Sequence, residues 1–201
     1  MTNNDLSIDD NYQYASQKYD VQNLIDYNIA QIFVMNYDWP GNNNKLFKSK
    51  SGDGKWRHVM YDSDFGFERW GANPFNIGSY ETYNMLDHAI GGDNAPAWAT
   101  AVFTTFLENM DFRNKFINTY CDRLNTTYSA ENTLYFMDSL RNIIEPYISD
   151  HINRYGPDIY DLFTPNTMGE YNSVYQGMEN FANYRPDNAR NEMVEIFGLS
   201  G

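Results

Sequence analysis

The chain has 201 residues, of which 42% are hydrophobic and 17% aromatic, and its formal net charge is −13. This is enough apolar material for one domain with its own core. Because only 14 residues are lysine or arginine, the chain lacks the basic face that a nucleic-acid partner requires. It also lacks a run of about 18 apolar residues, the length that spans a bilayer as a helix.

The beginning of the chain predicts one helix after a polar start. Residues 1–17 are mostly polar and are expected to form a flexible segment. Asp20 is a suitable helix N-cap, and the apolar residues after it recur at helical spacing until about Tyr37. Pro40 and Gly41 then break regular structure, so residues 38–44 are predicted to form a loop.

The next segment predicts a β-hairpin. Residues 45–50 and 55–61 each have the character of a short strand, and residues 51–54, Ser-Gly-Asp-Gly, form a tight turn between them. Residues 62–78 combine Gly and Pro with aromatic side chains. Such a segment is typical of a functional loop and is too irregular for a simple connection.

The rest of the chain is predicted to be helical. One helix is expected over residues 97–109, a second from residue 111 to about 124, and a third from residue 129, with a kink or an interruption at Pro146. Two more are expected over residues 168–184 and 186–197, the last one ended by Gly198. The predicted fold is therefore mainly α with a small β-hairpin, an α+β class.

Four polar side chains flank the predicted hairpin. Asp38 and Asn43 lie in the loop before it, and Asp62 and Asp64 follow it. Because a hairpin returns the chain close to its starting point, the two loops are expected to be neighbours in space. The sequence thus predicts one cluster of carboxylate and amide oxygens.

The order of these residues matches that of protein kinases, in which a catalytic Asp is followed five residues later by an Asn, then by a short β segment and the Asp of a D-F-G tripeptide. Carboxylate and amide oxygens suit Mg²⁺, and a further carboxylate orients the attacking hydroxyl, a role that falls to Asp38. Asp62 lies nearer the strand, whereas Asp64 begins the tripeptide itself, so both remain candidate ligands. Each pattern alone is also explained by turn formation, because Asp and Asn are common in loops.

Two segments carry a resemblance to a known family. Residues 36–43 read N-Y-D-W-P-G-N-N, and residues 55–67 read K-W-R-H-V-M-Y-D-S-D-F-G-F. With these motifs the chain resembles the CotH kinase family, named for a spore coat protein, over roughly residues 18–199. Further similar segments lie at residues 112–117 and 124–129 and from Arg185-Pro186 to the closing residues 197–199.

The resemblance implies a function and a set of site residues. Family members are atypical protein kinases, so residues 18–201 would form the catalytic, C-terminal lobe of a kinase-like fold. It would transfer phosphate from ATP, with Mg²⁺, to Ser or Thr of secreted or surface proteins. Asp38 would be catalytic, while Asn43 and Asp62, with Asp64 as a second candidate, would bind the metal and through it the nucleotide. The same resemblance implies an extracytoplasmic setting.

One departure from the kinase pattern concerns the nucleotide. Kinases cover ATP with a lobe that precedes the catalytic loop, and only 37 residues precede Asp38. The chain is therefore expected to be the catalytic-lobe part of a longer kinase, and alone to bind ATP weakly and turn over little. The alternative is a non-catalytic surface or coat protein that uses the same scaffold for binding, with carbohydrate as one candidate ligand. Aromatic residues near the site suggest that alternative, although packing beneath the hairpin is favoured for them: Trp39, Trp56, Trp70, Tyr80 and Tyr83.

Overall fold

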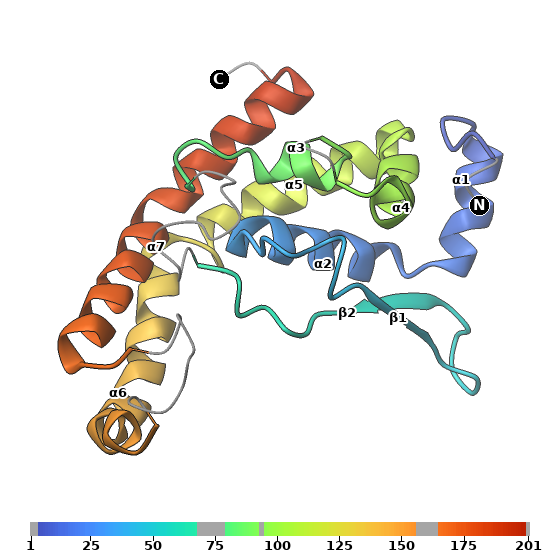
Figure 1. The fold of residues 1–201 in the computed structure, drawn as a ribbon. Coiled ribbons are helices and arrows are strands. Elements are labelled where there is room, and N and C mark those ends of the chain that lie inside the picture. Colours follow the sequence, from blue (N-terminus) through green and yellow to red (C-terminus); the bar gives the residue numbers. More distant parts are fainter. Residues whose placement is uncertain (1–3, 68–78, 93–94, 156–164, 200–201) are drawn as a thin grey trace.

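The computed structural model describes residues 4–67, 79–92, 95–155 and 165–199. These residues form helices and one two-stranded antiparallel sheet (Figure 1). The predicted class, mainly α with a small β-hairpin, is confirmed. The elements in chain order are α1 (Asp9–Lys18), α2 (Val21–Val34), β1 (Lys45–Lys48), β2 (Trp56–Val59), α3 (Met85–Ala89), α4 (Ala97–Leu107), α5 (Met110–Asn125), α6 (Ala130–Tyr155) and α7 (Met168–Phe197).

Helix α2 lies at the centre of the molecule. It contacts β2, α3, α5 and α7, and Figure 1 shows it between the hairpin on one side and α3, α4 and α5 on the other. Its N-cap is Asp20, as predicted, and the Asp20 side chain accepts a hydrogen bond from the Asn23 amide. Most of its residues are buried, which is expected of a helix that has neighbours on nearly every face.

Helix α1 lies largely within residues 1–17, where a flexible segment and no helix was expected. Leu6 and Ala15 are each only 1% exposed, and the ring of Tyr12 packs edge-on against Phe106. The Asn109 side-chain amide donates to the Leu6 carbonyl at 3.2 Å. The segment packs against partners about a hundred residues away, and such contacts leave no local pattern in the sequence.

Helices α6 and α7 pack against each other and form an arm that projects from the body, called here the α6–α7 arm (Figure 1). Helix α6 continues through Pro146, and in Figure 1 its last turns point in a different direction from its first. Helix α7 is also continuous, where two helices separated at Pro186 were expected. Pro186 is buried, so the packing of its ring into the core helps to offset the hydrogen bond that a proline removes from a helix.

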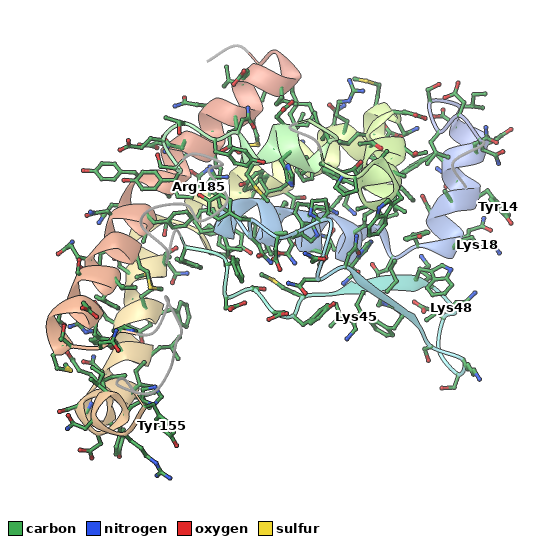
Figure 2. All side chains as sticks on the ribbon, viewed as in Figure 1. Tyr14, Lys18, Lys45, Lys48, Tyr155 and Arg185 are labelled. Atoms are coloured by element: carbon green, nitrogen blue, oxygen red, sulfur yellow. The ribbon has the colours of Figure 1, made fainter. Side chains whose placement is uncertain are left out.

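A buried ion pair joins α7 to the end of α2. Arg185, labelled in Figure 2, is fully buried. Its guanidinium donates to the carbonyls of Ile32 at 2.9 Å and Phe33 at 3.0 Å. It also pairs with both carboxylate oxygens of Glu192. Arg185 therefore supplies donors to carbonyls in the last turn of α2, where the Ile32 carbonyl also accepts from the C-cap amide of Met35 and where a helix lacks internal donors.

Glu192 extends this connection to α3. Its Oε2 accepts a hydrogen bond from the Leu86 amide at 3.3 Å, in the first turn of α3. First-turn amides have no partner within their own helix. Arg185 and Glu192 thus form hydrogen bonds with backbone groups at the ends of α2 and α3, and these bonds attach both helices to α7.

We predict that Arg185→Met lowers the free energy of unfolding by about 3–5 kcal/mol, because it leaves the Glu192 charge buried without its partner. The double variant Arg185→Met, Glu192→Met is expected to lose less than this single variant, since no charge is then left unpaired. Urea unfolding followed by circular dichroism measures both. The control is Arg154→Met, at an exposed position of α6, for which a change within about 0.5 kcal/mol is expected. A loss at position 185 no larger than this control would contradict the role given to Arg185.

Candidate functional site

The loop that carries Asp38 begins with a sharp turn at the end of α2. Met35 is the C-cap and adopts a left-handed conformation with φ of 52°, which a residue with a side chain takes only when the surroundings enforce it. The next turns are closed by hydrogen bonds from the Trp39 amide to the Asn36 carbonyl at 3.1 Å and from the Asn42 amide to the Asp38 carbonyl at 2.8 Å. Asp38 therefore sits in a hydrogen-bonded loop.

Two aromatic side chains attach this loop to α2. Trp39 is 3% exposed, and its indole Nε1 donates to the hydroxyl of Tyr27 at 2.9 Å. The Tyr27 hydroxyl lies 3.4 Å from the Asn43 carbonyl and donates to it. Packing, the favoured interpretation, is confirmed for Trp39. Trp56 is 38% exposed, and Trp70 lies outside the described residues.

The hairpin is attached to the same helix. The Asn23 side chain accepts from the His58 amide at 2.7 Å and donates to the His58 carbonyl at 3.2 Å, so that one side chain acts as a neighbouring strand would. The His58 ring stacks on Tyr27 with 4.5 Å between ring centroids. Strand pairing runs from Lys45 with Val59 to Lys48 with Trp56, which leads the chain back to Asp62.

The predicted residues Asp38, Asn43 and Asp62 come together at one point. The Asn43 amide nitrogen donates to Asp38 Oδ2 at 2.6 Å and to the Asp62 backbone carbonyl at 3.1 Å. Asn43 and Asp62 both have left-handed backbones, with φ of 54° and 52°. The two loops on either side of the hairpin are therefore joined by the Asn43 side chain, while the metal and nucleotide roles of these residues stay predictions.

Asn36 is a second amide at this junction, to which the sequence analysis gave no role although it begins the N-Y-D motif. It is completely buried, and its side-chain nitrogen donates to Gln31 Oε1 at 3.0 Å and lies 3.5 Å from the Asp62 carbonyl. The Asp62 carbonyl is thus approached by two amides, one from each end of the 36–43 motif.

The segment that carries the D-F-G tripeptide rests on the end of α2. The Phe67 amide donates to the Val34 carbonyl at 2.8 Å, and the Gly66 amide donates to the Ser63 carbonyl at 3.1 Å. A Cβ atom at Gly66 would lie 2.9 Å from the Val34 carbonyl oxygen, closer than van der Waals contact allows. Glycine is therefore required here by the close approach of two backbones. Of the predicted loop 62–78, residues 68–78 lie outside the described residues.

The electrostatic environment of Asp38 differs from that of its neighbours. Asp38 is partly buried, whereas Asp62 and Asp64 are exposed. Burial raises the pKa of the Asp38 carboxyl, and the negative charges of Asp62 and Asp64 raise it further, against an opposing effect of the Asn43 hydrogen bond. Two neighbouring negative charges thus add to the effect of burial in disfavouring the ionised form of Asp38.

This environment suits a cation. Asp38 Oδ1 is buried and has no hydrogen-bond partner among the described residues. A bound cation would supply a partner for this oxygen and would offset the negative charges of Asp62 and Asp64. Within the described residues, no cluster of three or more His, Cys, Asp or Glu side chains has a metal-binding arrangement. Mg²⁺ often binds through only one or two carboxylates and retains several waters, which is a smaller ligand set than such a cluster.

Comparison with known proteins identifies the family. A family model described as CotH kinase protein matches residues 1–189. The chain belongs to the CotH kinase family. The match includes α1, which lies before the region of resemblance seen in the sequence. Searches of curated proteins and of solved structures gave no match.

Within the described parts of this CotH family member, every helix is too short or too polar to cross a membrane.

We predict that Gly66→Ala lowers the free energy of unfolding by about 1–3 kcal/mol, because the added methyl group meets the backbone of Val34 and Ser63. The matched control is Gly177→Ala in α7, where an added Cβ has no neighbour within 4 Å. That change is expected to stabilise the protein by about 0.5–1 kcal/mol, since alanine favours a helix more than glycine does. Equal effects of the two substitutions in thermal or urea unfolding would show that the approach of residue 66 to α2 is unimportant.

A second prediction follows from the raised pKa of Asp38. At low pH the Asp38 carboxyl is protonated in both the folded and unfolded states, so it does not change the free energy of unfolding. As pH rises above the ordinary aspartate pKa of about 4, the unfolded state loses its proton first, so the folded state becomes less stable until the raised pKa has been passed. In buffer without divalent cations, Asp38→Asn is therefore expected to be more stable than the unaltered protein at pH 7, with the difference shrinking below pH 5.

Asn retains an oxygen that can accept the Asn43 hydrogen bond, so the Asp38→Asn substitution isolates the effect of charge. Unfolding is measured by urea titration at several pH values, with the exposed Asp187→Asn as control. If Asp38→Asn is less stable than the unaltered protein at pH 7, the charged Asp38 carboxylate does not lower the free energy of unfolding, and the prediction is wrong.

Proposed function

We propose that this protein is an atypical, Mg²⁺-dependent protein kinase that transfers the terminal phosphoryl group of ATP to Ser or Thr hydroxyls. The observation that carries the proposal is the contact of the Asn43 side chain with both Asp38 and the backbone of Asp62. It joins the two loops in which kinases place their catalytic and metal-binding residues. Membership of the CotH kinase family supports the same activity.

Asp38 is proposed to orient the attacking hydroxyl and to accept its proton. The Asn43 hydrogen bond to Oδ2 fixes the direction of the carboxylate, and positioning of this kind supplies much of the catalysis in phosphoryl transfer. The raised pKa of Asp38 makes its carboxylate a stronger base than an exposed aspartate, which favours proton acceptance at neutral pH.

Asp62, Asp64 and the side-chain oxygen of Asn43 are proposed to hold Mg²⁺ and, through it, the phosphates of ATP. A bound Mg²⁺ would neutralise charge on those phosphates and hold them for transfer. The exposure of Asp62 and Asp64 supports this assignment, because a metal that carries a nucleotide needs ligands on an open side of the protein. The proposed acceptors are secreted or surface proteins and the proposed setting is extracytoplasmic, both on the ground of the family resemblance.

The test is transfer of labelled phosphate from ATP, measured as autophosphorylation and on an added acceptor protein. It uses both this chain and the longest natural polypeptide that contains it. Transfer is expected in the longer polypeptide and is expected to disappear when Mg²⁺ is chelated. Asp38→Asn should reduce the rate by about 10²–10⁴-fold, the usual contribution of a general base, and Asp62→Asn should reduce it with a large increase in the Mg²⁺ concentration required.

The matched control is Asp187→Asn, an exposed carboxylate on α7 whose side chain is 85% accessible, and it is expected to leave the rate unchanged. Absence of transfer in the longer polypeptide, or equal rates in all variants, would overturn the kinase proposal. Those results would favour the non-catalytic binding role on the same scaffold.

A further inference from the structure

Helix α6 carries an exposed apolar stripe on the projecting α6–α7 arm. We call Phe136, Leu140, Ile143 and Tyr147 the α6 stripe; their exposed fractions lie between 57% and 69%. They are spaced by four, three and four residues, which places them on one side of a helix and is the spacing of helices that pair along their length. Tyr135 and Ile144 are also exposed, at 65% and 49%, and widen the stripe.

The opposite side of α6 is occupied by α7, and this fixes where the stripe points. Met137 belongs to a small buried cluster with Tyr175 and Ala182 of α7. The Tyr175 hydroxyl donates to Asp138 Oδ1 at 2.7 Å, and the Arg141 guanidinium lies 4.1 Å from the centre of the Tyr175 ring. With these contacts formed, the α6 stripe faces away from α7. Tyr147 follows Pro146, and its exposure of 69% shows that the change of direction of α6 does not bury this ring.

The order of residues in the stripe is symmetric. An aromatic residue stands at each end and an aliphatic pair in the middle, arranged about the midpoint between residues 141 and 142. If two copies of α6 pack antiparallel about a two-fold axis, Phe136 of one copy faces Tyr147 of the other, and Leu140 faces Ile143. A two-fold interface uses the same patch on both subunits, so the patch must complement itself. The stripe meets that requirement.

Charge and area favour the same arrangement. Residues 134–148 contain Asp138, Glu145 and Arg141 as their charged residues, a net charge of −1 in a chain whose total is −13. Arg141 also pairs with Glu145 at 2.9 Å. Two acidic molecules therefore meet little repulsion along this stripe. With about 150–250 Å² for each aromatic side chain, the exposed parts of Tyr135, Phe136 and Tyr147 offer about 300–500 Å² per copy. Leu140, Ile143 and Ile144 add to this area, and a stable interface buries about 800 Å² per partner.

We propose that the α6 stripe is a self-association surface, through which two copies of the protein pair antiparallel along α6. The interface has Leu140 and Ile143 at its centre and Phe136 and Tyr147 at its ends. None of the proposed site residues belongs to the stripe, so pairing and phosphate transfer can fail independently in experiments.

The test is the mass of the protein in solution, measured by light scattering after gel filtration and by sedimentation equilibrium over a range of concentrations. A reversible dimer is expected. The double variant Leu140→Glu, Ile143→Glu is expected to weaken it at least about 100-fold, because four carboxylates then meet at the centre of the interface. Both positions are more than 60% exposed, so the variant should keep the helical circular dichroism and unfolding midpoint of the unaltered protein.

A charge-reversal variant tests the antiparallel register. In Leu140→Lys, Ile143→Glu, each introduced lysine faces an introduced glutamate of the other copy only if the helices are antiparallel. This variant is expected to associate at least about tenfold more tightly than the double-glutamate variant. Met110→Glu, at an apolar position of α5 that is 56% exposed, is the matched control and should leave the dimer intact.

Three results would overturn the proposal. One is a monomer at every concentration, which would leave the stripe for a different partner. The second is an undiminished dimer in the double-glutamate variant, which would place the interface elsewhere. The third is equal weakening by the two double variants, which would exclude the antiparallel register.

Discussion

The carbonyl groups at the end of α2 are the constraint on which the rest of the structure depends. A helix leaves its last carbonyls without internal partners; here the C-cap amide of Met35 donates to Ile32, and further donors come from distant parts of the chain. Arg185 of α7 donates to Ile32 and Phe33, and the Phe67 amide donates to Val34. The hydrogen bonds to these carbonyls therefore bring α7 and the D-F-G segment together at the C-terminal end of α2.

The candidate site is a consequence of this meeting point. The loop with Asp38 leaves α2 where the D-F-G segment arrives, so two loops far apart in sequence start from a common support. Asn36 and Asn43 then reach the Asp62 carbonyl from the two ends of one short motif. The carboxylates are held close in spite of their repulsion because backbone and amide contacts, rather than the charged groups themselves, fix the geometry.

Local patterns predicted much of the fold and which polar residues meet beside the hairpin. Helical spacing located α2 and α5, turn residues located the hairpin, and the hairpin alone implied that Asp38, Asn43 and Asp62 would be neighbours. The missed features depend on distant contacts. Helix α1 contacts residues about a hundred positions away, α7 continues through Pro186, whose ring is buried, and Arg185 donates to carbonyls more than 150 residues earlier. A single sequence contains no local signal for such pairs.

Tyr27 shows how firmly the two halves of the site are connected. Its hydroxyl accepts from Trp39 and donates to the Asn43 carbonyl, while its ring stacks on His58 of the hairpin. Burial raises the pKa of Tyr27 to about 12, so the phenol keeps its proton across the whole physiological range and can act as donor and acceptor at once. The loop that carries Asp38 and the hairpin therefore share a contact through one neutral side chain, whose charge does not change around neutral pH.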